Sequence, residues 1–311
     1  AIASAVPQDA TMEQRKEAME KMQALGSAVK AKQDSLQKQY DGKTLALFLN
    51  GYQMVEPPEF TIPDGCANPD SARMAFYYAF FRDHYFDNVN LSDERTYYMP
   101  FIGGRLDTYL NRVLAQRYDS IIPQAINMVE MSRGSDFTFK IMANYMLGYA
   151  TNYDLPGFLD MRHIMGIDNL IVELADRYYL NGEAFWADSA LIEKVRKKAD
   201  KIRYCQIGKP AQNIALATAD SVYTPIYDMA GTKYTVLVFY EPDCGHCQKR
   251  LPLISEYYKQ FSGSPDVKVI AVCMTDNKQA WQKFIKDITS DPAVTAKVAW
   301  NLLVSRSTSV N

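Results

Sequence analysis

The sequence lacks an excess of charge of either sign and lacks a long apolar run. Its 311 residues carry 34 Lys and Arg against 36 Asp and Glu, a formal net charge of −2. Without a basic excess, the composition gives no indication of nucleic-acid binding. No apolar run approaches the roughly 20 residues that a membrane-spanning helix needs. The 48% apolar content is that of an ordinary globular protein with a buried core, and the length favours two domains.

Cysteine and histidine are also scarce, which excludes several kinds of site. The cysteines are Cys66, Cys205, Cys244, Cys247 and Cys273. They are too few and too scattered for a disulfide scaffold. Cys66 and Cys205 could pair in an oxidising compartment, but nothing in the sequence brings them together. Cys273 ends the apolar run VIAVC and is interpreted as a small core residue.

Residues 10–204 are predicted to form an all-helical domain, because apolar residues recur there at three- or four-residue spacing. Thr11 and Gln14 fit a capping box at the start of the first helix. The segment 56–70 contains four prolines and is predicted to be an extended connector over the surface. No charge or motif in this part indicates a chemical role.

Some details of these helices can also be predicted. The helix after the connector is expected to begin with Asp70 or Ser71 as its cap. Pro123 is expected in the first turn of a later helix, where its missing N–H costs little. His84 and His163 are interpreted as hydrogen-bonded helix residues, and Trp186 as a residue of core or interdomain packing.

The pattern changes after Gly208, and residues 205–311 are predicted to form a second, βαβ domain. KYTVLVFYE (233–241) and DVKVIAVCMT (266–275) are short β-branched and aromatic runs typical of buried strands. A helical pattern follows each run, and Asp276 or Asn277 is expected to cap the second helix. This order predicts a mostly parallel sheet whose strands are covered on both faces.

The motif Cys-Gly-His-Cys follows the first of these strands directly and precedes a helix. Cys244 should therefore lie at the helix N-terminus, where free N–H groups and the dipole favour a thiolate. Cys247 lies one turn further along the same side and could resolve a mixed disulfide made by Cys244. His246 offers a donor or a positive charge nearby, whereas the acids Glu241 and Asp243 would raise the thiol pKa if they are close.

Two other interpretations of the motif are weaker. A structural zinc site needs four Cys or His ligands, and the sequence has a single Cys-x-x-Cys with the remaining histidines in the helical part. Two inert core cysteines would not require Gly-His between them at a strand-to-helix junction. A redox site is therefore the preferred interpretation.

The stretch VLVFYEPDCGHCQKRLP resembles the strand, active site and kinked helix of the thioredoxin superfamily, with Pro252 at the position of the kinking proline. The preceding lead-in, IGKPAQNIALATADSVYTPIYDMAGTKYTVLVFY, is similar to that of TlpA/ResA-like exported thiol:disulfide oxidoreductases. MGIDNLIVELADRYYLNGEAFW resembles a helical domain of unknown function that precedes such domains in some bacterial envelope proteins. The resemblance implies Cys244 as nucleophile, Cys247 as resolving cysteine, and a periplasmic or envelope location, the signal peptide being absent from this chain.

The sequence departs from the superfamily pattern at three places. Val238 stands where a buried acid is common, so Glu241 is the candidate to assist proton transfer at Cys247. Asp243 replaces a tryptophan before the first cysteine. Ser309 stands about where the cis-proline is expected, and the sequence gives no evident cis-proline loop, last hairpin or last helix for the thioredoxin-like domain. A sheet without those strands would leave an open edge, which could promote self-association.

Three hypotheses follow. The preferred one is a protein disulfide oxidoreductase of open direction, with Cys244, Cys247 and His246 as site residues, supported by Gly245 and Pro252. It uses no metal or organic cofactor, only its own redox-active disulfide. Its partners would be protein thiols and disulfides of the envelope and an electron donor or acceptor. The alternatives are a redox-inactive binding or scaffold protein using the helical domain and, with less support, a thiol-dependent peroxidase.

Overall fold

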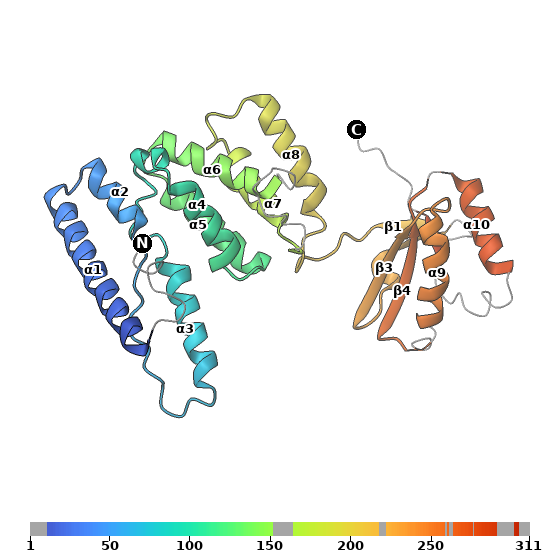
Figure 1. Cartoon of the computed structure of the whole chain (residues 1–311). Coiled ribbons are helices and arrows are strands. Elements are labelled where there is room, and N and C mark those ends of the chain that lie inside the picture. Colours follow the sequence, from blue (N-terminus) through green and yellow to red (C-terminus); the bar gives the residue numbers. More distant parts are fainter. Residues whose placement is uncertain are drawn as a thin grey trace. The chain divides into compact units, whose positions relative to one another are not determined.

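The structure is a computed structural model and describes residues 11–151, 164–217, 222–258, 260, 264–275, 277–290 and 302–304. The chain divides into two compact units, Ala1–Lys209 and Pro210–Asn311 (Figure 1). The first unit is helical, and every strand in the described parts of the chain belongs to the second. The predictions for His163, Asp276 and Ser309 lie outside the described residues.

The described part of the first unit is built from helices. They are α1 (Met12–Gln39), α2 (Thr44–Tyr52), α3 (Pro69–His84), η2 (Glu94–Tyr98), α4 (Ile102–Thr108), η3 (Tyr109–Val113), α5 (Tyr118–Met131), α6 (Asp136–Thr151), α7 (Asn169–Leu174), η5 (Ala175–Tyr179) and α8 (Ser189–Arg203). η2 is a 3₁₀ helix, and η3 and η5 are π-helical turns that continue α4 and α7. The proline-rich connector runs between α2 and α3 as extended chain.

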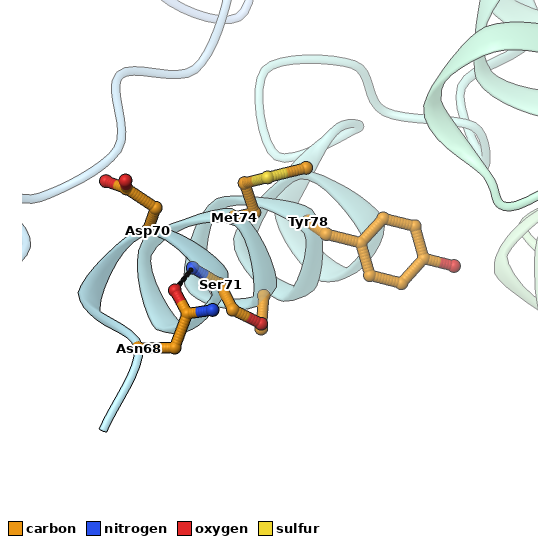
Figure 2. A pocket seen from close by; sticks show the side chains of 6 residues that line it. Asn68, Asp70, Ser71, Met74 and Tyr78 are labelled. Carbon is orange, nitrogen blue, oxygen red and sulfur yellow. Dashed lines mark hydrogen bonds between the residues drawn. The ribbon is translucent and has the colours of Figure 1, made fainter. Parts of the chain in front are cut away.

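The starts of α1 and α3 show how capping fixes helix boundaries. The capping box at Thr11 is confirmed: its hydroxyl accepts from the Gln14 N–H, and the Gln14 amide accepts from the Thr11 N–H. The prediction for α3 is wrong by two to three residues. Asn68 caps this helix through a 3.0 Å bond from the Ser71 N–H to its side-chain oxygen (Figure 2). Pro69 then occupies the first helical position, where its ring costs no hydrogen bond.

The expected place of Pro123 is also wrong. α5 begins at Tyr118, so Pro123 lies in its second turn, inside the helix. An ion pair between Arg117 and Asp119 at 2.5 Å accompanies the first turn. Because proline has no N–H, the Asp119 carbonyl receives no bond from position 123.

The core of the first unit is rich in tyrosines whose hydroxyl groups find partners at the edge of the core. Tyr109, Tyr178 and Tyr179 are each at most 2% exposed. The Tyr109 hydroxyl bonds to the Arg82 carbonyl, that of Tyr178 to Glu130, and that of Tyr179 to Asn144. Their rings supply apolar area while each hydroxyl keeps a hydrogen-bond partner, as is usual for buried tyrosines.

The described part of the second unit contains a five-stranded sheet. Its elements are β1 (Ala215–Ala217), β2 (Tyr223–Pro225), η6 (Ile226–Met229), β3 (Tyr234–Tyr240), α9 (Gly245–Tyr258), β4 (Val267–Cys273), α10 (Lys278–Ser290) and β5 (Leu302–Val304). In the sequence, one helix follows each of the strands β2, β3 and β4. The strand order is β2-β1-β5-β4-β3. β3, β4 and β5 are parallel, and β1 is antiparallel to β2 and β5.

The two α-helices of this unit, α9 and α10, cover the same face of the sheet (Figure 1). Leu251 of α9 and Trp281 of α10 pack in one cluster with Tyr240, Ala271 and Cys273 from the strands. The opposite face carries a smaller cluster in which η6 and β1 pack on β4: Leu216, Ile226, Ile270 and Val272. Asn277 caps α10, since its side-chain oxygen accepts the Ala280 N–H at 3.0 Å. Asn277 is one of the two residues that the sequence predicted for this cap.

The prediction that both strand runs are buried on both faces is correct for β4 and wrong for β3. Residues 269–273 of β4 are buried, whereas β3 is the edge strand of the described sheet. Tyr234 is 68% exposed, Val236 47% and Phe239 59%. β3 pairs with β4 on one side, and its outer edge has no pairing strand among the described residues. Apolar composition predicts a strand, but a strand's place in the sheet decides its burial.

Candidate functional site

The Cys-Gly-His-Cys motif is held where β3 ends and α9 begins. β3 ends at Tyr240 and α9 starts at Gly245, so Cys244 immediately precedes the helix, as predicted. The Cys244 N–H donates to the Glu241 carbonyl at 3.2 Å, which closes a tight turn between the two elements. The Cys244 carbonyl accepts from the Gln248 N–H at 3.0 Å, the first bond of the helix.

The sulfur of Cys244 receives several hydrogen bonds from the start of α9. The backbone N–H of Cys247 donates to Sγ at 3.4 Å. The Cys247 thiol and the His246 backbone N–H also donate to it. The Cys247 thiol is the strongest of these influences, and together they hold the pKa of Cys244 below its ordinary value. Donors at a helix N-terminus stabilise a thiolate because they would otherwise be unpaired.

Cys247 has the opposite character. The interaction of its thiol with the Cys244 sulfur raises the pKa of Cys247, and burial adds to this effect. Cys247 is half-buried and packs against the apolar cluster beneath α9. The Cys244 thiol is therefore the more readily ionised of the two, which is the order that a nucleophile and its resolving cysteine need.

Glu241 opposes ionisation at both sulfurs. Its side chain is exposed, and its carboxylate raises the pKa of Cys244 and of Cys247. Its effect on Cys244 is smaller than that of the hydrogen bonds, so the net direction for Cys244 remains downward. The other acid that the sequence offered, Asp243, is exposed and is not among the described groups that act on the two thiols.

The remaining predicted site residues take simpler places. His246 contributes its backbone N–H to Cys244, while its side chain is exposed. Gly245 is the first residue of α9, and a Cβ there would meet nothing within 4 Å. Pro252 lies inside α9 and is half-buried.

Two features beside the motif were not predicted from the sequence. The Gln248 side-chain amide donates to the Pro242 carbonyl at 2.8 Å and ties the loop before Cys244 to the first turn of α9. Beneath the loop, the Trp281 indole N–H donates to the Tyr240 hydroxyl at 3.2 Å. That hydroxyl in turn bonds to the Cys273 sulfur. Neither contact has a local sequence signal: the first depends on the loop folding back on α9, and the second on the packing of α10 against β3.

The other singled-out residues belong to the first unit or, like Cys273, to the core of the second. Cys66 and Cys205 are free and do not form a disulfide. Cys273 is fully buried, as expected for a core residue, and burial raises the pKa of its thiol. His84 bonds to Asp87 at 2.8 Å, in agreement with its prediction.

Trp186 packs against the helical core, donates to Asn144 and contacts Phe139 edge-on. The first unit also carries an open hollow of about 680 Å³ over the first turns of α3, shown in Figure 2. Its lining residues are Asn68, Asp70, Ser71, Met74, Ala75 and Tyr78. They form no set of nucleophile and base, so the hollow is not the redox site.

In the described part of the chain, no three His, Cys, Asp or Glu side chains gather as they would around a metal ion. No described helix is both long and apolar enough to cross a membrane.

Comparison with known proteins adds to this geometry. The sequence model of the AhpC/TSA family matches residues 207–308, a range that contains the Cys244–Cys247 motif. Among solved structures, a thioredoxin-like protein from Bacteroides caccae is similar, with 14% identity and a TM-score of 0.46. That alignment covers 82% of this chain and 84% of the other. No curated protein matches the sequence.

The predicted fold class is confirmed: an all-helical first part is followed by a thioredoxin-like part with few strands. The family match supports the thioredoxin superfamily for this second part and a thiol-based redox function.

Proposed function

We propose that the C-terminal unit is a protein disulfide oxidoreductase that exchanges disulfides through Cys244 and Cys247. The observation that carries the proposal is the place of Cys244 at the start of α9, where its sulfur accepts the Cys247 backbone N–H at 3.4 Å. This position favours ionisation of the Cys244 thiol, and the Cys247 thiol lies one helical turn away. The family match, which spans the motif, adds independent support for thiol chemistry.

In this mechanism the Cys244 thiolate attacks one sulfur of a substrate disulfide. A mixed disulfide forms, and the other substrate sulfur leaves as a thiolate that takes up a proton. Cys247 then gives up its proton and attacks the Cys244 sulfur, and the second substrate sulfur leaves. Two electrons pass to the substrate, which ends as a dithiol, while Cys244 and Cys247 end as a disulfide. Read backwards, the same steps oxidise a substrate dithiol.

The proposal requires no metal or organic cofactor, because the reduced Cys244–Cys247 dithiol itself holds the two electrons that pass to the substrate. Its partners are protein thiols and disulfides and a second protein that restores the pair. We place the exchange in the bacterial envelope, on the resemblance of residues 207–240 to exported oxidoreductases. The role of the helical unit in this scheme would be to recognise or position a partner.

The test is the reduction potential of the pair, measured by equilibrating the protein with glutathione or dithiothreitol buffers and trapping free thiols. A reversible two-electron couple is the expected result. A value near about −270 mV would mark a reductase, and one above about −180 mV an oxidase or isomerase. Absence of a couple would refute the proposal and favour the scaffold alternative.

Two variants make the assignment specific. Cys247→Ser should accumulate a mixed disulfide with a scrambled substrate protein, because the resolving thiol is gone, whereas Cys244→Ser should accumulate none. Equal trapping by both variants would contradict the assigned roles. Efficient consumption of hydrogen peroxide by the reduced protein, with slow disulfide exchange, would favour the peroxidase alternative instead.

A further inference from the structure

The long helix α1 lies at the outer edge of the helical unit, beside α2 (Figure 1). The structure describes all 28 of its residues, and none of them is buried. The half-buried Gln33, Asp34 and Gln37 lie on one side of the helix, the side that also carries Lys30. Lys30 forms an ion pair at 2.6 Å with Glu56 of the proline-rich connector. This side is therefore the one by which α1 contacts its own unit.

A second side of α1 carries an apolar stripe, the α1 seam. The seam comprises Ala18, Met22, Leu25, Val29 and Leu36. Its residues follow the alternating four- and three-residue steps by which one helix faces another in a coiled coil. Since each residue turns a helix by about 100°, the seam lies roughly 100° around α1 from the side that carries Lys30.

The centre of the seam is open in the part of the chain that the structure describes. Met22 is 47% exposed, Leu25 54% and Val29 48%. A helix in a protein gains most of its stability by packing an apolar face against a neighbour. The seam is thus an apolar face that still lacks its neighbour in a single copy of the chain.

The pattern of charge indicates how a second α1 would fit the seam. With two helices antiparallel and Leu25 opposite Val29 of the second copy, Met22 falls opposite Lys32 of that copy. The Lys32 stem can then pack along Met22 while its ammonium group stays in water. Parallel helices would place Lys32 against Lys32 across the seam, which charge repulsion disfavours. The positions that flank the seam carry a single charge, that of Lys21.

We propose that the α1 seam is a homodimer interface, on which the same seam of a second copy of this chain packs antiparallel. A 3.5-residue apolar repeat is matched by a helix with the same repeat, and α1 itself supplies that helix. The contact is isologous and closes with a two-fold axis, as in most homodimers. It uses no residue of the redox pair, so it is independent of the proposed disulfide exchange.

Sedimentation velocity of the full chain over a range of concentrations measures this association. Dithiothreitol is present throughout, so that disulfides between copies do not contribute. The wild-type protein should pass from monomer to dimer as its concentration rises. Leu25→Glu removes a central apolar contact twice per dimer and should raise the dimer dissociation constant at least about 100-fold.

The matched control is Ala24→Glu, one residue away on the same helix. Ala24 is exposed and lies off the seam, and its replacement adds the same charge. It should change the dissociation constant by less than about threefold. Circular dichroism should show that both variants keep their helix content, because glutamate is a good helix former.

Met22→Glu tests the antiparallel arrangement. The carboxylate that it introduces would lie opposite Lys32 of the second copy, so the dimer should persist at low salt and weaken as salt is added. Adding Lys32→Glu to the same chain should abolish the dimer, because two carboxylates then face each other. A Met22→Glu variant that dissociates as completely as this double variant would overturn the antiparallel pairing.

Two other results would overturn the interface itself. One is a wild-type protein that stays monomeric at the highest concentration tested, which would also leave the seam without a second copy as its occupant. The other is an equal effect of Leu25→Glu and Ala24→Glu, which would show that net charge and not the seam governs association.

Discussion

Replacing Tyr240 with phenylalanine tests the buried contacts that support the site from below. Tyr240 and Trp281 are each 2% exposed, and the Trp281 indole N–H donates to the Tyr240 hydroxyl at 3.2 Å. The hydroxyl also bonds to the Cys273 sulfur. Tyr240→Phe keeps the ring and its packing against Phe284, but it leaves the indole N–H buried without an acceptor.

The expected magnitude follows from that unsatisfied donor. A buried N–H without a partner costs about 1–3 kcal/mol, so roughly 2 kcal/mol is expected for Tyr240→Phe. With a urea m-value of about 2 kcal/mol/M, the unfolding midpoint should fall by roughly 1 M. Amide exchange in strands that open only on unfolding of the unit should accelerate about 30-fold.

Hydrogen exchange read by mass spectrometry is the suitable assay, because it reports β4 separately from the helical unit. The matched control is Tyr258→Phe, which removes a longer 3.3 Å bond to the Val267 carbonyl and leaves no orphaned donor. It should cost less than about 1 kcal/mol. If Tyr240→Phe exchanged no faster than Tyr258→Phe in peptides covering Val269–Cys273, the reasoning about the buried indole would be refuted.

Two further predictions concern the helical unit and the sheet edge. Arg105 is 7% exposed and donates to the carbonyls of Gly51 and Gln53 at the end of α2, so Arg105→Met should destabilise that region by about 3 kcal/mol. Hydrogen exchange of α2 measures this, and the exposed Arg117→Met should change stability by less than about 1 kcal/mol. Val236→Lys, on the unpaired edge of β3, should weaken any concentration-dependent self-association in sedimentation velocity. A wild-type protein that stays monomeric at high concentration, or a variant that associates equally, would contradict that prediction.

Local sequence signals were sufficient where a few consecutive residues decide the outcome. The Thr11–Gln14 capping box and the position of Cys244 before α9 depend only on side chains within one helical turn. The same signals failed when a neighbouring residue competed for the role. Asn68 took the cap of α3 because Pro69 fits the first helical position, and the Asp70 and Ser71 alternatives then lay inside the helix.

The environment of the redox pair was only partly predictable. The helix start and the nearby acids were evident in the sequence, but the turn that bonds the Cys244 N–H to the Glu241 carbonyl was not. Gln248 was missed because its partner, the Pro242 carbonyl, becomes available only when the loop folds back on α9.

The sequence by itself determined that a strand, a Cys-x-x-Cys turn and a helix follow one another, since these features arise from short-range periodicity and backbone geometry. Only the tertiary structure decided that β4 is central and β3 is an edge. Two apolar runs of similar composition therefore differ in burial, from fully buried Cys273 to largely exposed Tyr234. The physical reason is that burial is a property of the neighbours on each side of a strand, and those neighbours are brought together by residues distant in the chain.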